Sequence, residues 1–270
     1  MTKAKIVTAL TYVLLIVASL VSVFPLLWMF ISATNHTVDV VSGRLLPGSY
    51  LVENYKSLTA RADVARALWN SFKNAAVQTV ASLLICSLAG YGFEIYHDRA
   101  KDIVMRILLT SIMIPFAAIM IPLFMVVGRL NLLDTTTAFV LPTVATAVLI
   151  FLFRQSARYF PQEIIEAARL EGMGEIAIFF RMYIPIMRST YATAAIITFM
   201  AAWNNYLWPL IIMQKPTSQT MPLLLSNLIS GYVTDYGALM LAVSISVLPT
   251  IVIFLLLQRS FAEGIIMSAK

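Results

Sequence analysis

The sequence predicts an all-α membrane protein, and its composition together with its hydrophobic runs leads to that fold class. Of the 270 residues, 60% are hydrophobic and only 12% are charged, whereas soluble domains carry about 25% charged residues. So little charge cannot cover a soluble surface of this size. The hydrophobic runs have about the 20 residues of a transmembrane helix, and they are too long and too uniform for the alternating strands of a membrane β-barrel.

Six hydrophobic stretches are candidate transmembrane helices, and they predict one membrane domain over residues 1–270. In chain order they are Ile6–Ser32, Asn74–Phe93, Ile107–Val127, Thr137–Phe153, Thr190–Met213 and Gly237–Leu257. The first is longer than the hydrophobic part of a signal peptide, about 7–15 residues, so we expect it to be retained. Prolines lie inside several stretches. A membrane bundle tolerates them because neighbouring helices satisfy the freed backbone groups.

The distribution of basic residues predicts that both termini lie in the cytoplasm. With six spans the termini share one side of the membrane. Placing them inside assigns 12 of the 19 Lys and Arg residues to inner segments and 7 to outer segments, and Lys and Arg are enriched on the cytoplasmic side. The net charge of +6 therefore belongs to the loops, and we expect contact with membrane lipid and no nucleic-acid partner.

The six stretches contain no Asp, Glu, Lys or Arg, and Glu94 stands just beyond the second. Carriers driven by protons or ions keep ionisable groups at mid-membrane. Their absence counts against a stand-alone secondary carrier and favours a pathway for a neutral solute. The sequence also lacks the GxxxxGK[ST] motif of ATP-binding loops, and Cys86, His36 and His97 show no spacing typical of metal sites. We expect no enzyme activity, no metal and no ATP site in this chain.

A long cytoplasmic segment, Arg154–Ser189, joins the fourth and fifth stretches and predicts a helix–turn–helix. Pro161 suits the first turn of a helix. Good helix formers follow it, up to Gly172 and Gly174, which break the helix. A second, apolar helix is expected over Glu175–Ile184.

The first helix of this segment carries a sequence signature. Glu166 and Arg169 stand three residues apart, so their side chains can pair on one helix face. The sequence Glu166-Ala167-Ala168, followed by Gly172 and then by Met182-Tyr183-Ile184-Pro185, resembles the EAA loop of binding-protein-dependent ABC importer permeases. In that family the loop is a coupling helix that docks in a groove on the ATPase subunit. The resemblance implies the ABC importer permease fold and the ATPase-coupling residues Glu166, Ala167, Ala168, Arg169 and Gly172.

Two further segments resemble the carbohydrate-importer permeases that are similar to the MalG maltose permease. Trp203–Leu210 resembles their WNxFLWPL run, although an acidic residue is common where Asn205 stands. Gln258–Phe261, Gly264 and Lys270 resemble their C-terminal QRxF…G…K pattern. The resemblance implies an ATP-driven sugar importer, with an importer for another small polar solute, such as a polyol, as the alternative.

The resemblance also implies partners. An importer of this kind needs a second permease subunit, expected here as a heterodimer partner, and an extracellular or periplasmic solute-binding protein. It also needs two ATPase subunits, which bind ATP and magnesium. Its place is the cytoplasmic membrane of a prokaryote, and the outer loop Gln214–Tyr236 is expected to touch the binding protein. A membrane scaffold without transport activity is a further, weaker interpretation.

Asn204, Asn205 and Trp208 are the candidate substrate-pathway residues. In a continuous fifth span, Asn204 would lie about 21 Å from the cytoplasmic start, past the midplane, and Trp208 would neighbour both amides. Amides and an aromatic face suit a neutral sugar, which offers hydroxyls and an apolar ring face. Alternatively, the aromatic residues form an interfacial belt and the amides bond between helices.

Overall fold

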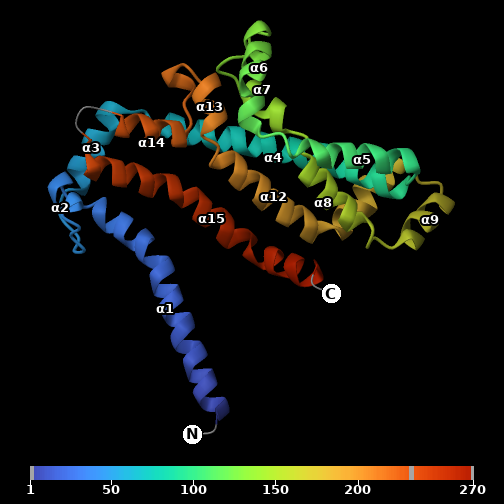
Figure 1. Cartoon of the computed structure of the whole chain (residues 1–270), viewed down its shortest axis with the longest axis horizontal. Coiled ribbons are helices and arrows are strands. Elements are labelled where there is room, and N and C mark those ends of the chain that lie inside the picture. The colour runs from blue at the N-terminus through green and yellow to red at the C-terminus, as the bar shows by residue number, and fades with distance from the viewer. Residues whose placement is uncertain (1–2, 231–233, 269–270) are drawn as a thin grey trace. The chain divides into compact units, whose positions relative to one another are not determined.

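The structure is a computed structural model that describes residues 3–230 and 234–268, and every regular element in this part of the chain is a helix (Figure 1). Side chains are described for residues 7–230 and 234–256. The all-α fold predicted from the hydrophobic runs is confirmed. Of the C-terminal pattern, Lys270 and the side chains of Gln258–Phe261 lie outside the described part.

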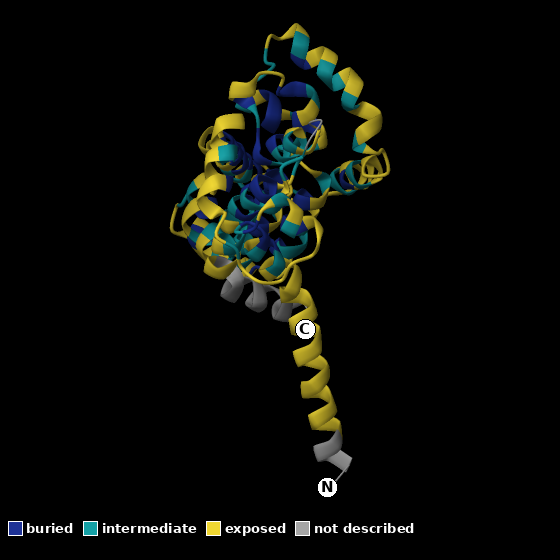
Figure 2. Ribbon diagram, turned by 90° about the vertical axis from the view of Figure 1, so that its left-hand side faces the viewer, coloured by how far each residue is buried: buried dark blue, intermediate teal, exposed yellow. Residues whose placement is uncertain are grey.

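Among the described residues, three helices are long and apolar enough to cross a membrane by themselves. They are α1 (Lys3–Ser32), α4 (Val64–Ile95) and α15 (Tyr236–Ser268), over Val7–Ser32, Val64–Ile95 and Tyr236–Leu256. Only 6% of the apolar part of α1 is buried within the chain (Figure 2). Its hydrophobic surface is therefore left for lipid or for another chain.

The third and fourth predicted spans are broken helices. α5 (Arg99–Ser111) and α6 (Phe116–Arg129) meet at 98°. α7 (Thr136–Val140), extended by the 3-10 turn η1 (Leu141–Thr143), meets α8 (Ala147–Ala157) at 57°. Pro115 precedes α6 and Pro142 lies in η1. Proline lacks the N–H that a helix needs and disfavours helical backbone in the residue before it, which explains why α5 does not continue into α6. The residue before Pro142 stays helical, and the bend before α8 follows at Thr146, which has extended backbone.

The fifth predicted span, Thr190–Met213, is wrong as a continuous helix. α12 (Arg188–Trp203) ends at Trp203, and the short α13 (Leu207–Ile212) begins at Leu207. Counting each bent pair as one span, the described helices provide up to 5 candidate spans, so the number six stays a prediction. The other elements are α2 (Thr37–Val41), α3 (Leu51–Arg61), α9 (Gln162–Leu170), α10 (Glu175–Ile178), η2 (Phe179–Tyr183), α11 (Ile184–Ile186), η3 (Pro216–Ser218) and α14 (Met221–Ile229).

The chain divides into two compact units, and the single domain over residues 1–270 stays a prediction. The first unit comprises Met1–Ala65 and Leu224–Pro249, and the second comprises Arg66–Leu223 and Thr250–Lys270. Within the first unit, the carboxylate of Asp235 accepts hydrogen bonds from Thr37 at 3.0 Å and from Ser57 at 2.6 Å. These bonds join the start of α15 to α2 and α3.

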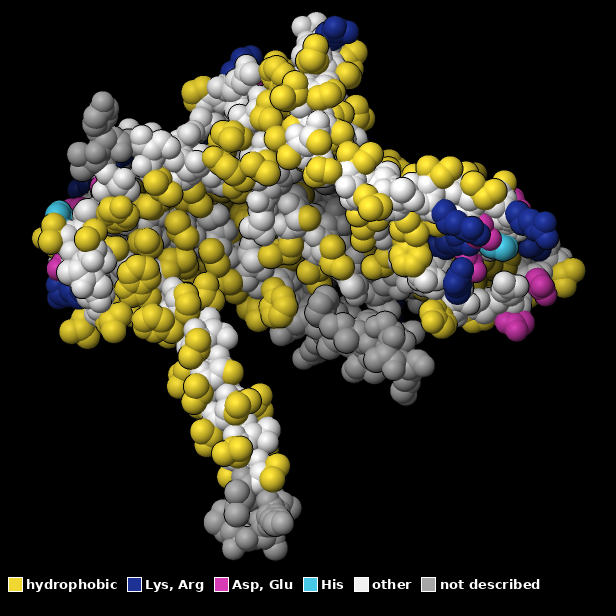
Figure 3. Space-filling model, in the orientation of Figure 1, with side chains coloured by type: hydrophobic (Ala, Val, Ile, Leu, Met, Phe, Trp, Pro, Cys, Tyr) yellow, Lys and Arg dark blue, Asp and Glu magenta, His cyan; other side chains and the backbone are white. Residues whose placement is uncertain are grey.

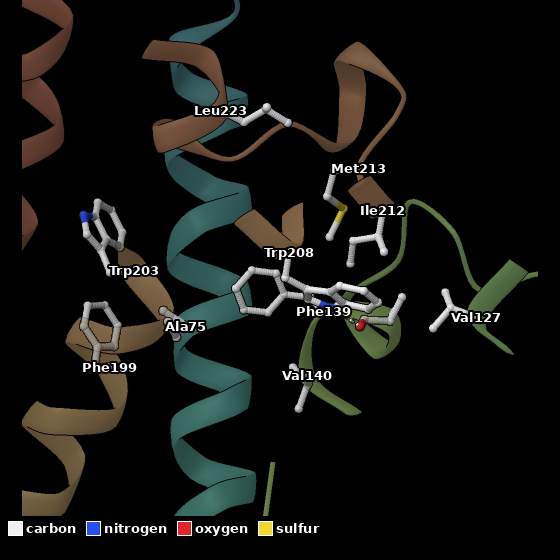
Figure 4. Packing of buried hydrophobic residues seen from close by; sticks show 12 residues of the cluster. Ala75, Val127, Phe139, Val140, Phe199, Trp203, Trp208, Ile212, Met213 and Leu223 are labelled. Atoms are coloured by element: carbon white, nitrogen blue, oxygen red, sulfur yellow. Dashed lines mark hydrogen bonds between the residues drawn. The ribbon is translucent and has the colours of Figure 1, made fainter. Parts of the chain in front are cut away.

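The largest hydrophobic core of the second unit lies around α4. Figure 4 shows Phe199 and Trp203 of α12 on one side of α4, and Trp208 and Phe139 on the other. The Trp208 side chain is fully buried, and its indole N–H donates to the carbonyl of Ala138 at 2.9 Å. This bond fixes α13 against α7.

Candidate functional site

The segment Arg154–Ser189 folds as the helix–turn–helix expected from its sequence. α9 begins directly after Pro161, and its C-terminus is closed by a Schellman motif. In that motif Gly172 N–H donates to the carbonyl of Arg169 and Met173 N–H donates to the carbonyl of Ala168, both at 3.0 Å. Gly172 has a φ of +78°, which favours glycine. Gly174 then precedes α10.

Part of the second helix of this segment is a π-helix, which is wider than the expected α-helix. After α10 the chain forms a π-helical turn, Phe179–Tyr183, before α11. Pro185 offers no N–H to the carbonyl four residues before it, so the regular α-helical bond is missing there. π-helical turns are rare in proteins, and those that occur are often found at functional sites. This turn therefore makes the segment a candidate functional site. Its hydrophobic residues alone gave no sign of it.

Aromatic packing fixes the EAA loop, residues 154–189, to α4. Tyr91 of α4 lies 4.9 Å from the ring of Tyr183 and 5.3 Å from that of Phe179, between centroids. Ile165 and Ala168 of α9 are buried in the same cluster. A movement of the loop would therefore be transmitted to α4.

Arg169 does not pair with Glu166 as the helical spacing suggested. Its Nε lies 2.7 Å from Oε1 of Glu175, across the turn, and its guanidinium lies over the ring of Tyr96 at 5.8 Å. The hydrogen bond from Arg169 holds the pKa of the Glu175 carboxyl below its ordinary value. Arg169 therefore braces the turn between α9 and α10, a role that depends on contacts from outside its own helix.

The outer face of the loop is exposed and partly apolar. Glu166 and Ala167 are exposed, whereas Ala168 is buried. Three large hydrophobic side chains nearby in the sequence are also open, with exposed fractions of 85% for Tyr159, 90% for Leu170 and 76% for Ile176. Open hydrophobic side chains beside polar ones are typical of a surface that binds another protein.

Next to this loop, a buried arginine joins the ends of three helices. Arg154 of α8 has a side chain only 5% exposed, and it contacts Glu94 at 3.1 Å and Asp102 at 2.6 Å. Arg158 adds a second ion pair to Glu94 at 3.2 Å, and His97 contacts Asp102 at 3.0 Å. Figure 3 shows charged side chains gathered at this end of the second unit. Removing one partner of a buried pair is strongly destabilising, so this cluster should hold α4, α5 and α8 together.

The structure does not bring the three candidate pathway residues together on one helix face. Asn204 caps the end of α12, is exposed, and donates from Nδ2 to the carbonyl of Met200 at 2.9 Å. Asn205 is half-buried in the break. Trp208 lies beyond the break and is fully buried, so in this conformation it offers no surface to a solute. The amides remain pathway candidates, while the burial of Trp208 favours a packing role.

A polar cavity of about 290 Å³ lies at the start of α4 and was not expected from the sequence. Its lining includes Asn70, Lys73, Asn74, Asp134, Thr136 and Lys215. The Asp134 carboxylate accepts hydrogen bonds from the Ser218 hydroxyl at 2.5 Å and from the Lys215 N–H at 2.9 Å. Partial burial alone would raise the pKa of Asp134, but these hydrogen bonds hold that pKa below its ordinary value.

Known proteins are similar to this chain in sequence and in fold. The family model for the binding-protein-dependent transport system inner membrane component matches residues 83–266. A lactose transport system permease protein of Rhizobium radiobacter is 44% identical over 96% of this chain and 95% of its own length. The arabinooligosaccharides transport system permease protein of Bacillus subtilis is 34% identical over 73% of this chain and 70% of its own.

Two other similarities add to these. The sn-glycerol-3-phosphate transport system permease protein of Pectobacterium atrosepticum is 31% identical, with 96% of each chain covered. A chain of a bacterial ABC transporter involved in the import of the acidic polysaccharide alginate has the same fold. Its TM-score is 0.82 and its sequence identity is 21%, over 97% of this chain and 98% of that one.

Proposed function

The chain belongs to the family of inner membrane components of binding-protein-dependent transport systems, and from this premise we propose that it is the permease subunit of an ATP-driven importer for sugars. It has the all-α fold of an ABC importer permease and is a transport subunit rather than an enzyme. Relatives named for the transport of lactose and of arabinooligosaccharides support a sugar as the solute. Relatives named for sn-glycerol-3-phosphate keep a polyol derivative as the second candidate solute.

The exposed face of the EAA loop is the observation that carries the coupling role. Glu166 and Ala167 are open to a partner, and Leu170 and Ile176 add apolar area to the same segment. In the proposal this face docks on an ATPase subunit. Ala168 packs inward, Arg169 braces the turn and Gly172 permits it. Because aromatic residues join the loop to α4, a push from the ATPase would reach the transmembrane helices.

An importer of this family works with ATPase subunits and a solute-binding protein. The finer assembly that we propose has a second, different permease, two ATPase subunits that bind ATP and magnesium, and a binding protein outside the membrane. The chain would be a multi-pass protein of a prokaryotic cytoplasmic membrane with both termini inside. Asn204 and Asn205, at the break between α12 and α13, would border the solute path.

Purification of the complete complex tests the function. We expect the complex in proteoliposomes to hydrolyse ATP and to take up sugar when its binding protein is present. Lactose, an arabinose oligosaccharide and sn-glycerol-3-phosphate should be compared as solutes. If only sn-glycerol-3-phosphate is taken up, the solute is the polyol derivative rather than a sugar. ATP hydrolysis by the pure isolated subunit would contradict the assignment.

Charge reversal at Glu166 tests the coupling role. We expect Glu166→Lys to insert normally but to lower uptake by about 10–100-fold, because losing a charged hydrogen-bond partner costs about 1.5–3 kcal/mol. Glu166→Gln keeps the size of the side chain and should have an intermediate effect. Transport at the normal rate by Glu166→Lys would show that this residue does not couple the two subunits.

A further inference from the structure

A row of buried polar side chains runs along the mostly apolar helix α4. Asn70, Asn74, Gln78 and Ser82 follow one another at intervals of four residues. Each step of four turns about 40° around a helix, so Asn74, Gln78 and Ser82 fall within about 80°. Their exposed fractions are only 2%, 6% and 1%, and that of Asn70 is 8%. These four residues are called the polar row below.

Two members of the polar row have a buried oxygen without a partner. Within the described part of the chain, neither Oε1 of Gln78 nor Oγ of Ser82 has a hydrogen-bond partner, although both atoms are fully covered. Asn70 and Asn74 are bonded, to the carbonyls of Thr217 and Gln219 and to Thr136 respectively. Eight buried side-chain oxygens lack a partner in the described residues, and those of Gln78 and Ser82 are the two that stand four residues apart on one helix. Buried polar groups are nearly always bonded, to protein or to water, so this pair on one helix face needs an explanation.

Two contacts, one on either side of Gln78 and Ser82 along α4, join this helix to the broken α7–α8 span. At one end, Thr136 donates to Oδ1 of Asn74 at 2.8 Å, and at the other the Cys86 thiol lies 3.6 Å from the carbonyl of Val144. Gln78 and Ser82 lie between these contacts on α4. The opposing chain between them leaves the α-helix, through η1 and the bend before α8. Non-helical backbone at membrane depth occurs where protein covers it or where it lines a water-filled cavity, and broken helices build the solute sites of many transporters.

The polar row begins in the cavity described above. Asn70 and Asn74 belong to both, so the cavity and the unpaired oxygens follow one another along the same helix. A volume of about 290 Å³ lies near the lower end of small-molecule sites. The first charged residue after Lys73 along α4 is Glu94. A charged solute would therefore find no opposite charge on α4 beside Gln78 and Ser82, whereas hydroxyl groups can donate to both oxygens.

We propose that the cavity and the polar row form a passage site for a neutral, hydroxyl-rich solute, with solute hydroxyls donating to Oε1 of Gln78 and Oγ of Ser82. This inference rests on the proposed function and names the part of the chain that recognises the solute. In the conformation described, both oxygens are covered, and the α7–α8 span contacts α4 on either side of them. In the proposal, the oxygens become available to the solute when this span moves. The unpaired oxygens are thus acceptors kept for the solute.

Uptake of lactose by the assembled complex tests the site. We expect Gln78→Leu to lower initial uptake by about tenfold and Ser82→Ala by a smaller factor, each compared at equal complex yield. Ser87→Ala is the matched control, because Ser87 is equally buried in α4 but bonds within the helix to the carbonyl of Leu84 at 3.3 Å. It should transport at nearly the normal rate.

Labelling gives a second readout that does not depend on yield. In a Cys86→Ala background, Gln78→Cys should react with a small thiol reagent during ATP turnover, and lactose should slow the reaction. If the two oxygens only bind buried water, both variants should take up lactose normally and lactose should not slow the labelling. That result would overturn this inference but leave the proposed function standing. A wild-type complex that takes up no sugar would remove the proposed function and this inference with it.

Discussion

Gly172 allows the chain to turn between α9 and α10. Its φ of +78° lies in the left-handed region, where a side chain costs about 1–2 kcal/mol. A β-carbon built on it meets no atom within 4 Å, so backbone strain is the whole expected effect of adding one. Gly174 has a φ of −73° and equally open surroundings, which makes it a matched control.

We predict that Gly172→Ala weakens docking of the ATPase subunit, whereas Gly174→Ala does not. The strain disfavours the Schellman turn and should lower the fraction of loops in the docking conformation by about 5–30-fold. The amount of ATPase subunit that co-purifies with each variant measures the effect. Equal recovery with both variants would mean that the loop reaches its docking shape without this turn.

The residues of the loop show which parts of a site the sequence can predict. Pro161, Gly172 and the Glu166-Ala167-Ala168 run act within a few residues of themselves, so their spacing is informative. The partners of Arg169 could not be predicted, because Glu175 reaches it across the turn and Tyr96 reaches it from the residue after α4. The polar row was detectable as a spacing of four, but its significance depends on which oxygens lack partners.

At the scale of elements, α4 and α8 touch backbone to backbone at Gly90. A β-carbon built on Gly90 would lie 2.6 Å from Cβ of Phe153 and 2.7 Å from the backbone nitrogen of Arg154. Arg154 is also the buried arginine that binds Glu94 and Asp102. The crossing and the ion pairs therefore fix the same ends of the two helices, close to the EAA loop.

We predict that Gly90→Ala destabilises the chain by about 1–3 kcal/mol, the usual effect of overpacking, because both blocking atoms belong to or adjoin the backbone. Gly92→Ala, two residues along the same helix, meets nothing within 4 Å and should be neutral or slightly stabilising. Thermal unfolding of both variants in detergent measures the difference. Identical melting temperatures would show that the two helices separate at little cost.

The hydrophobic runs predicted where helices occur but not where they break. Hydropathy depends on side chains, and the chain stays largely apolar around the bends near Pro115 and Pro142. The amides of Asn204 and Asn205 do stand at the break between α12 and α13, but an asparagine alone does not require a helix to end. A proline inside a run can be tolerated, as Pro249 is in α15, or can end the helix, as Pro115 does. Packing against neighbouring helices decides between the two, and the sequence of one segment does not contain it.

The start of α15 is joined to α2 and α3 through Asp235. Burial alone would raise the pKa of this carboxyl, but the hydrogen bonds from Ser57, the Ala238 N–H and Thr37, with Arg61 nearby, hold the pKa below its ordinary value. A lowered pKa in the folded state means that the fold favours the charged form. The stabilisation is therefore fully present above the unfolded pKa of about 3.9 and is lost as the pH falls through the folded pKa.

We predict that Asp235→Asn lowers stability at neutral pH by about 1.5–3 kcal/mol, the usual contribution of hydrogen bonds to a charged group. The difference from wild type should shrink as the pH falls below about 4, because the wild-type carboxyl then becomes neutral as well. Melting temperatures of both proteins over this pH range check the prediction. Two parallel curves would contradict it.

At the scale of the whole molecule, α4 runs from the cavity to the EAA loop. It is one continuous helix from Val64 to Ile95, and Lys73, beside the cavity, stands 21 residues before Glu94, beside the loop (94 − 73 = 21). At about 1.5 Å per residue this is about 30 Å, the thickness of the hydrocarbon core of a bilayer. We therefore expect the two sites on opposite sides of the membrane, and the excess of basic residues predicts that the EAA loop lies on the inner side.

We predict that a cysteine at position 217 reacts from outside the cell and one at position 163 only from inside. Cys86 is the one cysteine of the chain, so Cys86→Ala gives a background free of thiols. Thr217 and Glu163 are both exposed, and each lies on its own side of the charge-free part of α4. A membrane-impermeant maleimide should therefore label Thr217→Cys in intact cells and Glu163→Cys only after permeabilisation. The reverse pattern would invert the topology and separate the EAA loop from any cytoplasmic ATPase, and labelling of both in intact cells would mean that α4 does not span the membrane between them.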